Sequence, residues 1–248
     1  GSINMCGRFV LATKPSAFID RFKIQENVED TQENFSFSQR ELEDLRREAE
    51  EIDGEFRSRY NIAPRGGIYA IARLDHEPAQ IAKFRWGLIP SWAKDETIGD
   101  KCFNARAETM GEKPSFRSAF KHSRCAVLAD GYYEWKQVAP KQKQPYFIHN
   151  ENSEPMFFAG LFEPKTETAT IVTTEADGEL RSLHTRRPVF LNAEEVQEWL
   201  NPQATKQDLV EVVLSSTDKG VGSYPVSTLV NRATVDDPTL IEPIETLL

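Results

Sequence analysis

The stretch Ile68-Tyr69-Ala70-Ile71-Ala72, followed by the run from Gln80 to Trp86, decides the fold class of this chain. Both runs are short and apolar, which is typical of strands, and Asp75-His76-Glu77-Pro78 between them is typical of a turn. The stretch therefore predicts two strands that are joined by a turn.

Similar short runs recur on both sides of this pair. Further strands are expected at 8–10, 124–129, 131–135, 145–149, 156–162, 168–174, 187–191 and 224–230. Helical spacing is found at 14–22, 38–52, 105–110, 115–120, 193–200 and 206–213. Many closely spaced strands with helices between and after them predict an α+β protein. We expect a single domain with a strongly curved, mostly antiparallel, barrel-like β-sheet and flanking helices.

An acidic segment at about 25–58 interrupts this pattern of strands. Ser38 followed by Glu41 predicts a capping box, and the apolar residues from Leu42 to Ile52 then fall at helical spacing. We interpret the segment as an acidic helical insertion whose amphipathic helix is a solvated appendage.

The composition of the 248 residues is that of a soluble globular protein, with 39% hydrophobic and 28% charged residues. No run approaches the ~20 apolar residues that span a bilayer, and no signal peptide is recognisable, so we expect an intracellular monomer without a membrane partner. Cys6, Cys102 and Cys125 include no CxxC pair and share no metal-ligand spacing with the histidines. This predicts reduced thiols, no metal and no cofactor.

The charges are unevenly distributed along the chain, whose formal net charge is −9. Segment 25–58 holds 12 acidic and 4 basic residues, and segment 192–248 holds 10 acidic and 3 basic residues. The remaining residues carry 23 basic and 17 acidic side chains. A positive surface built from that remainder could bind nucleic acid, whereas scattered solvated charge would explain the same excess.

The start of the chain offers the most distinctive chemistry. Gly1 to Asn4 is interpreted as the remnant of an expression tag, outside a domain at 5–248, so that Cys6 would natively follow Met5. Removal of Met5 would leave an α-amine and a thiol on one residue. An α-amine has a pKa of about 8 and is partly neutral at pH 7, so the pair could convert an aldehyde into an imine and then a thiazolidine. The alternative is that Cys6 is a small buried hydrophobic residue.

Two aromatic stretches suggest contacts with nucleic acid. Tyr60-Asn61-Ile62-Ala63-Pro64 sets an amide beside a proline turn. Trp86-Gly87-Leu88-Ile89-Pro90-Ser91-Trp92 resembles a rigid apolar wedge that could stack on bases, although both tryptophans could equally pack in the core.

Three further stretches carry polar groups that a core does not require. Phe103 to Thr109 joins Asn104, Arg106 and a carboxylate at the start of an expected helix, where anions bind. Glu134 stands in an aromatic strand, and burial there would raise its pKa and suit it to proton transfer. His184 is flanked by cations that favour its neutral form. Capping, ion-pairing and structural roles remain open for all three.

Six stretches taken together resemble the SOS response-associated peptidase (SRAP) family, in the order in which that family carries them. They are Met5-Cys6-Gly7-Arg8, Tyr60 to Pro64, Trp86 to Trp92, Asn104 to Thr109, Ala129 to Trp135, and His184 to Pro188. The resemblance extends from Met5 to about Asn231. Two departures are that Arg187 stands where the family usually has methionine and that segment 25–58 is longer than in compact members.

The resemblance implies a protein that binds single-stranded DNA and crosslinks to abasic sites, shielding the lesion during DNA repair, with autoproteolytic and lyase activities besides. It implies that Cys6 is the nucleophile, Glu134 the acid and base, and Asn104 and His184 polar groups beside the sugar. The residues expected to contact DNA are Arg8, Asn61, Pro64, Trp86, Gly87, Leu88, Ile89, Arg106 and Arg186.

Two other functions remain open from the sequence. A glutamine amidotransferase of the N-terminal-nucleophile class also begins with Met-Cys-Gly and uses its free amine as a base. A non-covalent reader of modified DNA would need Cys6 only for packing. While the residues before Cys6 are attached, its nitrogen is an amide that cannot form a Schiff base, so we expect little crosslinking from that form.

Overall fold

The computed structural model describes residues 6–22 and 35–245, and residues 25–34 of the expected acidic insertion at 25–58 lie outside them. The α-helices are α1 (Pro15–Ile19), α2 (Gln39–Asp53), α3 (Arg117–His122), α4 (Ala193–Trp199) and α5 (Lys206–Ser215). The short 3₁₀ helices are η1 (Glu96–Lys101), η2 (Gly178–Ser182), η3 (Thr228–Asn231) and η4 (Pro238–Ile241).

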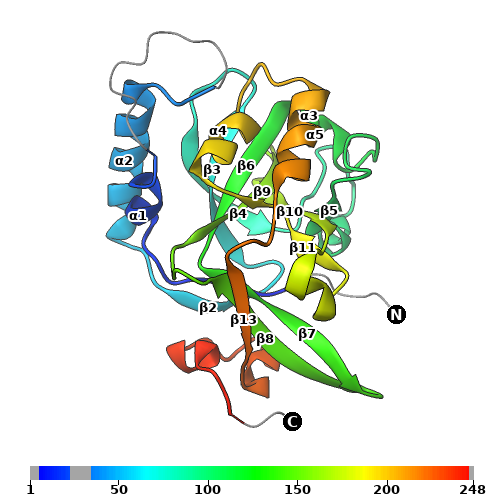
Figure 1. Cartoon of the computed structure of the whole chain (residues 1–248). Coiled ribbons are helices and arrows are strands. Elements are labelled where there is room, and N and C mark those ends of the chain that lie inside the picture. Colours follow the sequence, from blue (N-terminus) through cyan, green and yellow to red (C-terminus); the bar gives the residue numbers. More distant parts are fainter. Residues whose placement is uncertain (1–5, 23–34, 246–248) are drawn as a thin grey trace.

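The strands form two mostly antiparallel sheets (Figure 1). They are β1 (Phe9–Leu11), β2 (Arg59–Ile62), β3 (Gly67–Leu74), β4 (Gln80–Trp86), β5 (Asn104–Arg106), β6 (Ser123–Ala129), β7 (Gly131–Ala139), β8 (Gln142–Asn150), β9 (Met156–Glu163), β10 (Thr168–Glu175), β11 (Arg186–Pro188), β12 (Phe190–Leu191) and β13 (Val221–Pro225). The predicted α+β class with a curved, mostly antiparallel sheet is confirmed.

The larger sheet has eight strands and closes on itself. The predicted pair β3 and β4 is antiparallel, with Ile71 opposite Ile81, and β3 continues through β6 to β9. Strand β10 pairs with β9 on one side and, in parallel, with β4 on the other, so β10, β4, β3, β6 and β9 form a ring. Every residue of β6 is buried, because side chains fill the ring and helices cover it from outside.

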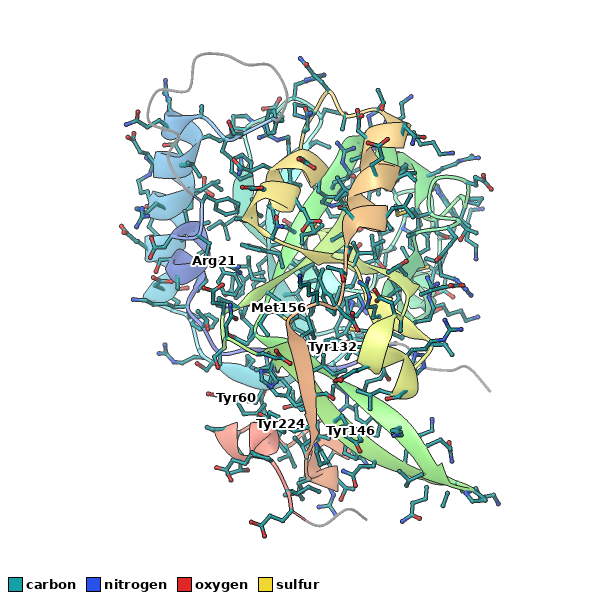
Figure 2. The ribbon with its side chains drawn as sticks, viewed as in Figure 1. Arg21, Tyr60, Tyr132, Tyr146, Met156 and Tyr224 are labelled. Atoms are coloured by element: carbon teal, nitrogen blue, oxygen red, sulfur yellow. The ribbon has the colours of Figure 1, made fainter. Side chains whose placement is uncertain are left out.

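The smaller sheet runs in the order β13-β8-β7-β1-β2, and its long β7–β8 hairpin extends away from the ring (Figure 1). Strand β1 lies between β2 and β7 in this sheet, with Phe9 opposite both Ile62 of β2 and Tyr132 of β7. A second apolar cluster covers this sheet, and Tyr60 and Tyr224, which pack against it, lie in the lower part of the molecule in Figure 2.

Helix α2 is not the solvated appendage that the sequence predicted. Ser38 caps it by accepting from the amide of Glu41, as expected. The Glu41 carboxylate does not complete the capping box but binds the buried guanidinium of Arg73 at 2.5 Å and accepts from the amide of Ala79. Buried leucines, among them Leu45, face the core, so the helix packs against the sheet with its acidic face outward.

Two predicted elements are wrong. The stretch 105–110 is not a helix, since β5 pairs in parallel with β10 and turns follow it. The exposed edge of β10 offers a ladder of hydrogen bonds that outweighs the weak local preference for a helix. The strand predicted at 224–230 instead begins at Val221, ends at Pro225 and is followed by η3.

Within residues 6–22 and 35–245, no helix is long and apolar enough to cross a membrane.

Candidate active site

An open cleft of about 640 Å³ lies between the β7–β8 hairpin and the segment that contains η2. In Figure 1 the short yellow helix lies beside the green hairpin. The residues that line the cleft are Gly7, Arg8, Glu134, Trp135, Lys136, Gln137, Lys143, Arg181, Ser182, Leu183, His184, Thr185 and Asn231. The cleft thus brings together three of the predicted site residues, Arg8, Glu134 and His184.

Glu134 forms the buried acidic group of this cleft. Strand β7 holds it with 2% of its surface exposed. Its Oε2 accepts from the backbone N–H of Cys6 at 3.3 Å, and its Oε1 accepts from the N–H of Trp135 at 3.3 Å. Burial raises the pKa of Glu134 to about 8, against the opposing effect of these two donors. A carboxyl group with this pKa is mostly protonated at pH 7, and the raised pKa agrees with the prediction made from its aromatic surroundings.

Cys6 lies directly behind Glu134. Its side chain is buried, and burial together with the nearby Glu134 raises the pKa of its thiol well above the ordinary value. Its φ of 31° lies in the left-handed range that non-glycine residues seldom adopt. Gly7 and Arg8, the next two residues, line the cleft. The backbone nitrogen of Cys6, rather than its sulfur, thus makes the contact with the acid.

Asn104 approaches Cys6 from the other sheet. The parallel pairing of β5 with β10 sets Asn104 opposite Ile171 and carries its amide to the N-terminal segment. Its Nδ2 donates to the carbonyl oxygen of Cys6 at 3.4 Å. Its Oδ1 is buried and accepts no hydrogen bond from the residues that the structure describes. A buried acceptor without a donor is a costly arrangement, which suits a group that awaits a ligand.

His184 stands on the η2 side of the cleft. Its Nδ1 accepts from the backbone N–H of Arg186 at 3.0 Å, so the proton of the neutral ring is on Nε2. Burial lowers the pKa of His184, and the charges of Lys143 and Arg186 lower it further. The neutral imidazole that the sequence predicted is thus favoured, with burial as the main cause.

Asn61 was predicted to contact DNA, but its side chain is buried and fully used within the protein. Its Nδ2 donates to the carbonyl oxygens of Val230, Arg232 and Val235, and its Oδ1 accepts from Arg8 Nη1 at 3.1 Å. The Asn61 side chain therefore holds the segment 230–235, which follows β13, next to Arg8.

Arg8 keeps its place in the cleft through the same network. Its Nη1 also donates to the carbonyl oxygen of Val230 at 2.7 Å, and partial burial lowers its pKa. The remaining edge of the guanidinium borders the cleft. Pro64, predicted beside it, is half-buried and does not line the cleft.

Arg186 was also predicted to contact DNA, and the structure uses it elsewhere. The side chain is 5% exposed and binds both carboxylate oxygens of Glu108 at 2.8 Å, as well as the carbonyl oxygen of Thr173. Arg106 is exposed, 3.9 Å from the same carboxylate. Because β5 replaces the expected helix, Arg106 is not at a helix N-terminus, and only its exposure suits it to bind phosphate.

The predicted wedge from Trp86 to Trp92 is buried in its first part, Trp86 to Ile89, and exposed at Trp92. Trp86 is 1% exposed, and its indole donates to the carbonyl oxygen of Phe103 at 2.8 Å, while Leu88 and Ile89 are 1% and 6% exposed. Their side chains cannot stack on bases in this conformation. Gly87 has a φ of 125°, and a Cβ there would lie 2.6 Å from the carbonyl oxygen of Gly99, so this glycine serves the turn. Only Trp92, at 58% exposure, presents its ring to solvent.

Three basic residues of the cleft were missed by the sequence analysis, namely Lys136, Lys143 and Arg181. No motif contains Lys143 or Arg181. The only sequence feature that pointed to such residues was the surplus of basic side chains outside the segments 25–58 and 192–248. That surplus gathers here, since Arg8 and these three cations surround a single carboxyl group.

The site offers proton transfer and anion binding. Among the described residues, no cluster of three or more histidine, cysteine or acidic side chains could hold a metal ion. Cys102 and Cys125 are buried free thiols like Cys6. The chemistry available is that of a buried protonated carboxyl group beside a backbone nitrogen, a neutral imidazole and a rim of cations.

Comparison with known proteins places this chain in a family. The chain is 39% identical over 246 residues to the abasic site processing protein YoqW of Bacillus subtilis, with 96% of this chain and 99% of that protein covered. It is 31% identical to the abasic site processing protein YedK of Escherichia coli, covering 82% of this chain and 91% of that protein. The abasic site processing protein HMCES of Gallus gallus is also 31% identical, covering 78% and 68%.

Solved structures share the fold. A protein from Bacteroides thetaiotaomicron superposes with a TM-score of 0.70 at 24% identity, covering 96% of this chain and all of that one. A phage-related protein from Bordetella bronchiseptica superposes with a TM-score of 0.64 at 26% identity, covering 90% and 95%. The model of the SOS response associated peptidase (SRAP) family matches residues 5–233. The chain therefore belongs to the SRAP family.

Proposed function

We propose that this protein captures abasic sites in DNA as a covalent adduct of Cys6, within a cleft that binds single-stranded DNA. The contact between the Cys6 nitrogen and the Glu134 carboxyl group, 3.3 Å apart at the floor of a basic cleft, carries the proposal. Membership of the family supports it, because relatives of this chain are named abasic site processing proteins. The protein then acts inside the cell, in association with DNA and as a monomer.

The first step exposes the amine of Cys6. The thiol attacks the carbonyl carbon of Met5, the peptide bond shifts to a thioester, and water hydrolyses it to leave a free α-amine. Glu134, beside the departing nitrogen, delivers the proton that this amine needs. A methionine aminopeptidase would give the same product where Met5 is the first residue.

The second step joins the protein to the lesion. The ring-opened sugar of an abasic site presents an aldehyde, which the α-amine of Cys6 attacks. Glu134 donates a proton to the departing water, leaving a Schiff base. The thiol then adds across the C=N bond, its sulfur bonding to carbon and its proton passing to nitrogen. The thiazolidine ring so formed has lost one water relative to the reactants.

Asn104 and His184 would hold the sugar during these steps. The Oδ1 of Asn104 has no donor within the described structure, so a sugar hydroxyl group or the new amine could supply one. His184 in its neutral form presents an Nε2–H group, which could donate to the 3′ phosphate and stabilise it as it leaves by β-elimination, while solvent takes the proton that the Schiff base loses. A lyase activity would follow from that step. Arg8 and Arg106 would bind the flanking phosphates.

The test is a denaturing gel of protein and a single-stranded oligonucleotide that contains one abasic site. A band of slower mobility that survives heating supports the proposal, and Cys6→Ala should abolish it. Persistence of the band in that variant would overturn it. Release of ammonia from glutamine without any adduct would favour an amidotransferase, and binding without an adduct would favour a non-covalent reader of modified DNA.

A further inference from the structure

We propose that Lys143 and Arg181 form a clamp across the mouth of the cleft that binds a phosphodiester of the DNA strand next to the abasic sugar. This proposal rests on the proposed function, because its ligand is the DNA strand that carries the abasic site. It adds a second phosphate-binding subsite to the one expected at Arg8 and Arg106.

The two residues reach the cleft from opposite walls. Lys143 belongs to β8, where it lies opposite Gln137 near the end of the hairpin. Arg181 stands in the last turn of η2, three residues before His184. Both line the cleft that Glu134 and His184 also line, and both are exposed to solvent. A strand that enters the cleft therefore passes between a lysine and an arginine before its sugar reaches the acid.

Neither cation has a partner in the part of the chain that the structure describes. No hydrogen bond or ion pair to the side chain of Lys143 or Arg181 occurs among residues 6–22 and 35–245. By contrast, Arg65, Arg73 and Arg187 each bind a carboxylate, although the chain has a surplus of acidic residues to share. Unpaired cations that converge in a concave site are suited to an anion from outside, and phosphate is the anion that DNA provides.

The electrostatics of the cleft place the phosphate close to the chemistry. Lys143 lines the same cleft as Glu134 and His184, and its charge lowers the pKa of each. The other charged groups around them are Arg8, Lys136 and Arg181 in the cleft and Arg186 behind His184. Glu134, largely protonated at neutral pH, adds little negative charge. A phosphate bound by Lys143 would offset that cation and favour the protonated carboxyl group.

Equilibrium binding without crosslinking tests the clamp. The probe is a fluorescent single-stranded oligonucleotide with a tetrahydrofuran abasic analogue, which has no aldehyde, and the readout is anisotropy over a range of salt concentrations. We expect Lys143→Ala and Arg181→Ala each to weaken binding about three- to tenfold and to reduce the slope of log affinity against log salt by about 0.7. Lys165→Ala, which removes an exposed lysine outside the cleft, should change neither quantity.

Two outcomes separate the clamp from the proposed function. If the double variant Lys143→Ala and Arg181→Ala binds with the affinity and salt slope of the wild type, the clamp is wrong, whether or not the wild type forms an adduct. If the variants lose affinity and slope while the wild type forms no adduct with a true abasic site, the clamp stands and the covalent function fails. Thermal unfolding of each variant checks that these exposed substitutions leave the fold intact.

Discussion

Replacing Glu134 with glutamine is predicted to change how the stability of the protein depends on pH. Burial raises the pKa of this carboxyl group from its ordinary 4.5 to about 8. Between these two values the unfolded chain releases the proton and the folded protein keeps it. The contribution of Glu134 to stability is therefore most favourable below about pH 4.5, falls as the pH rises, and is least favourable above about pH 8.

The size of the effect follows from the same shift. Each pH unit within the interval lowers the free energy of unfolding of the wild type by about 1.4 kcal/mol, so moving from about pH 5.5 to about pH 7.5 lowers it by about 3 kcal/mol. Glutamine is neutral throughout and contributes no such slope. It keeps one acceptor for the two amides of Cys6 and Trp135 and turns an NH₂ group toward the other, which costs about 1–3 kcal/mol at every pH.

The assay is urea unfolding of the wild type and Glu134→Gln at both pH values, with Glu175→Gln as a control that removes an exposed carboxylate. We expect the free energy of unfolding of the variant, minus that of the wild type, to be about 3 kcal/mol more positive at the higher pH than at the lower pH. Formation of the adduct should fall about 10²–10⁴-fold, as when an acid or base catalyst is lost. An equal difference between the two proteins at both pH values would show that Glu134 is ionised in the fold, and would refute its role as an acid.

Four further substitutions test whether residues of the predicted DNA-binding stretches stabilise the fold or bind DNA. Asn61→Ala should lower the free energy of unfolding by about 1–3 kcal/mol, because it removes the donor to the carbonyl oxygen of Val235 and one acceptor of Arg8 Nη1, and urea unfolding measures this. Arg186→Ala should lower it by about 1–3 kcal/mol, since it removes the two hydrogen bonds to the partly exposed Glu108 and the donor to the carbonyl oxygen of Thr173; a loss of DNA binding at unchanged stability would contradict this. Trp86→Ala should cost about 3–5 kcal/mol of stability. Trp92→Ala should leave stability unchanged within about 0.5 kcal/mol and weaken single-strand binding by about 1–3 kcal/mol in anisotropy titrations.

The sequence predicted most strands because their pattern is local. Short apolar runs such as Ile68 to Ala72 need only their own residues to indicate a strand. The closure of the ring depends on β10 meeting both β9 and β4, and no local pattern records such a pairing. The failure at 105–110 has the same cause, because the partner strand lies more than sixty residues away.

The chemistry of the site was more predictable than its surfaces. Glu134 and His184 were predicted as site residues from residue type and motif, and the structure brings both to one cleft with the predicted direction of each pKa shift. Asn61, Trp86 and Arg186 were predicted to contact DNA because they stand in family motifs. A motif does not indicate whether a side chain is buried or exposed. Burial depends on the whole fold, which turns these three side chains inward.

The central claim is that Cys6 reacts through a free α-amine, and mass spectrometry of the intact protein after incubation with abasic single-stranded DNA tests it most directly. Two forms are compared, one beginning at Cys6 and one that retains the residues before it. We predict for the first form a product with the summed mass of protein and oligonucleotide less one water. The second form should give little or none unless it has trimmed its own N-terminus to Cys6. An equal yield of adduct from a form whose N-terminal residues are intact would contradict the account.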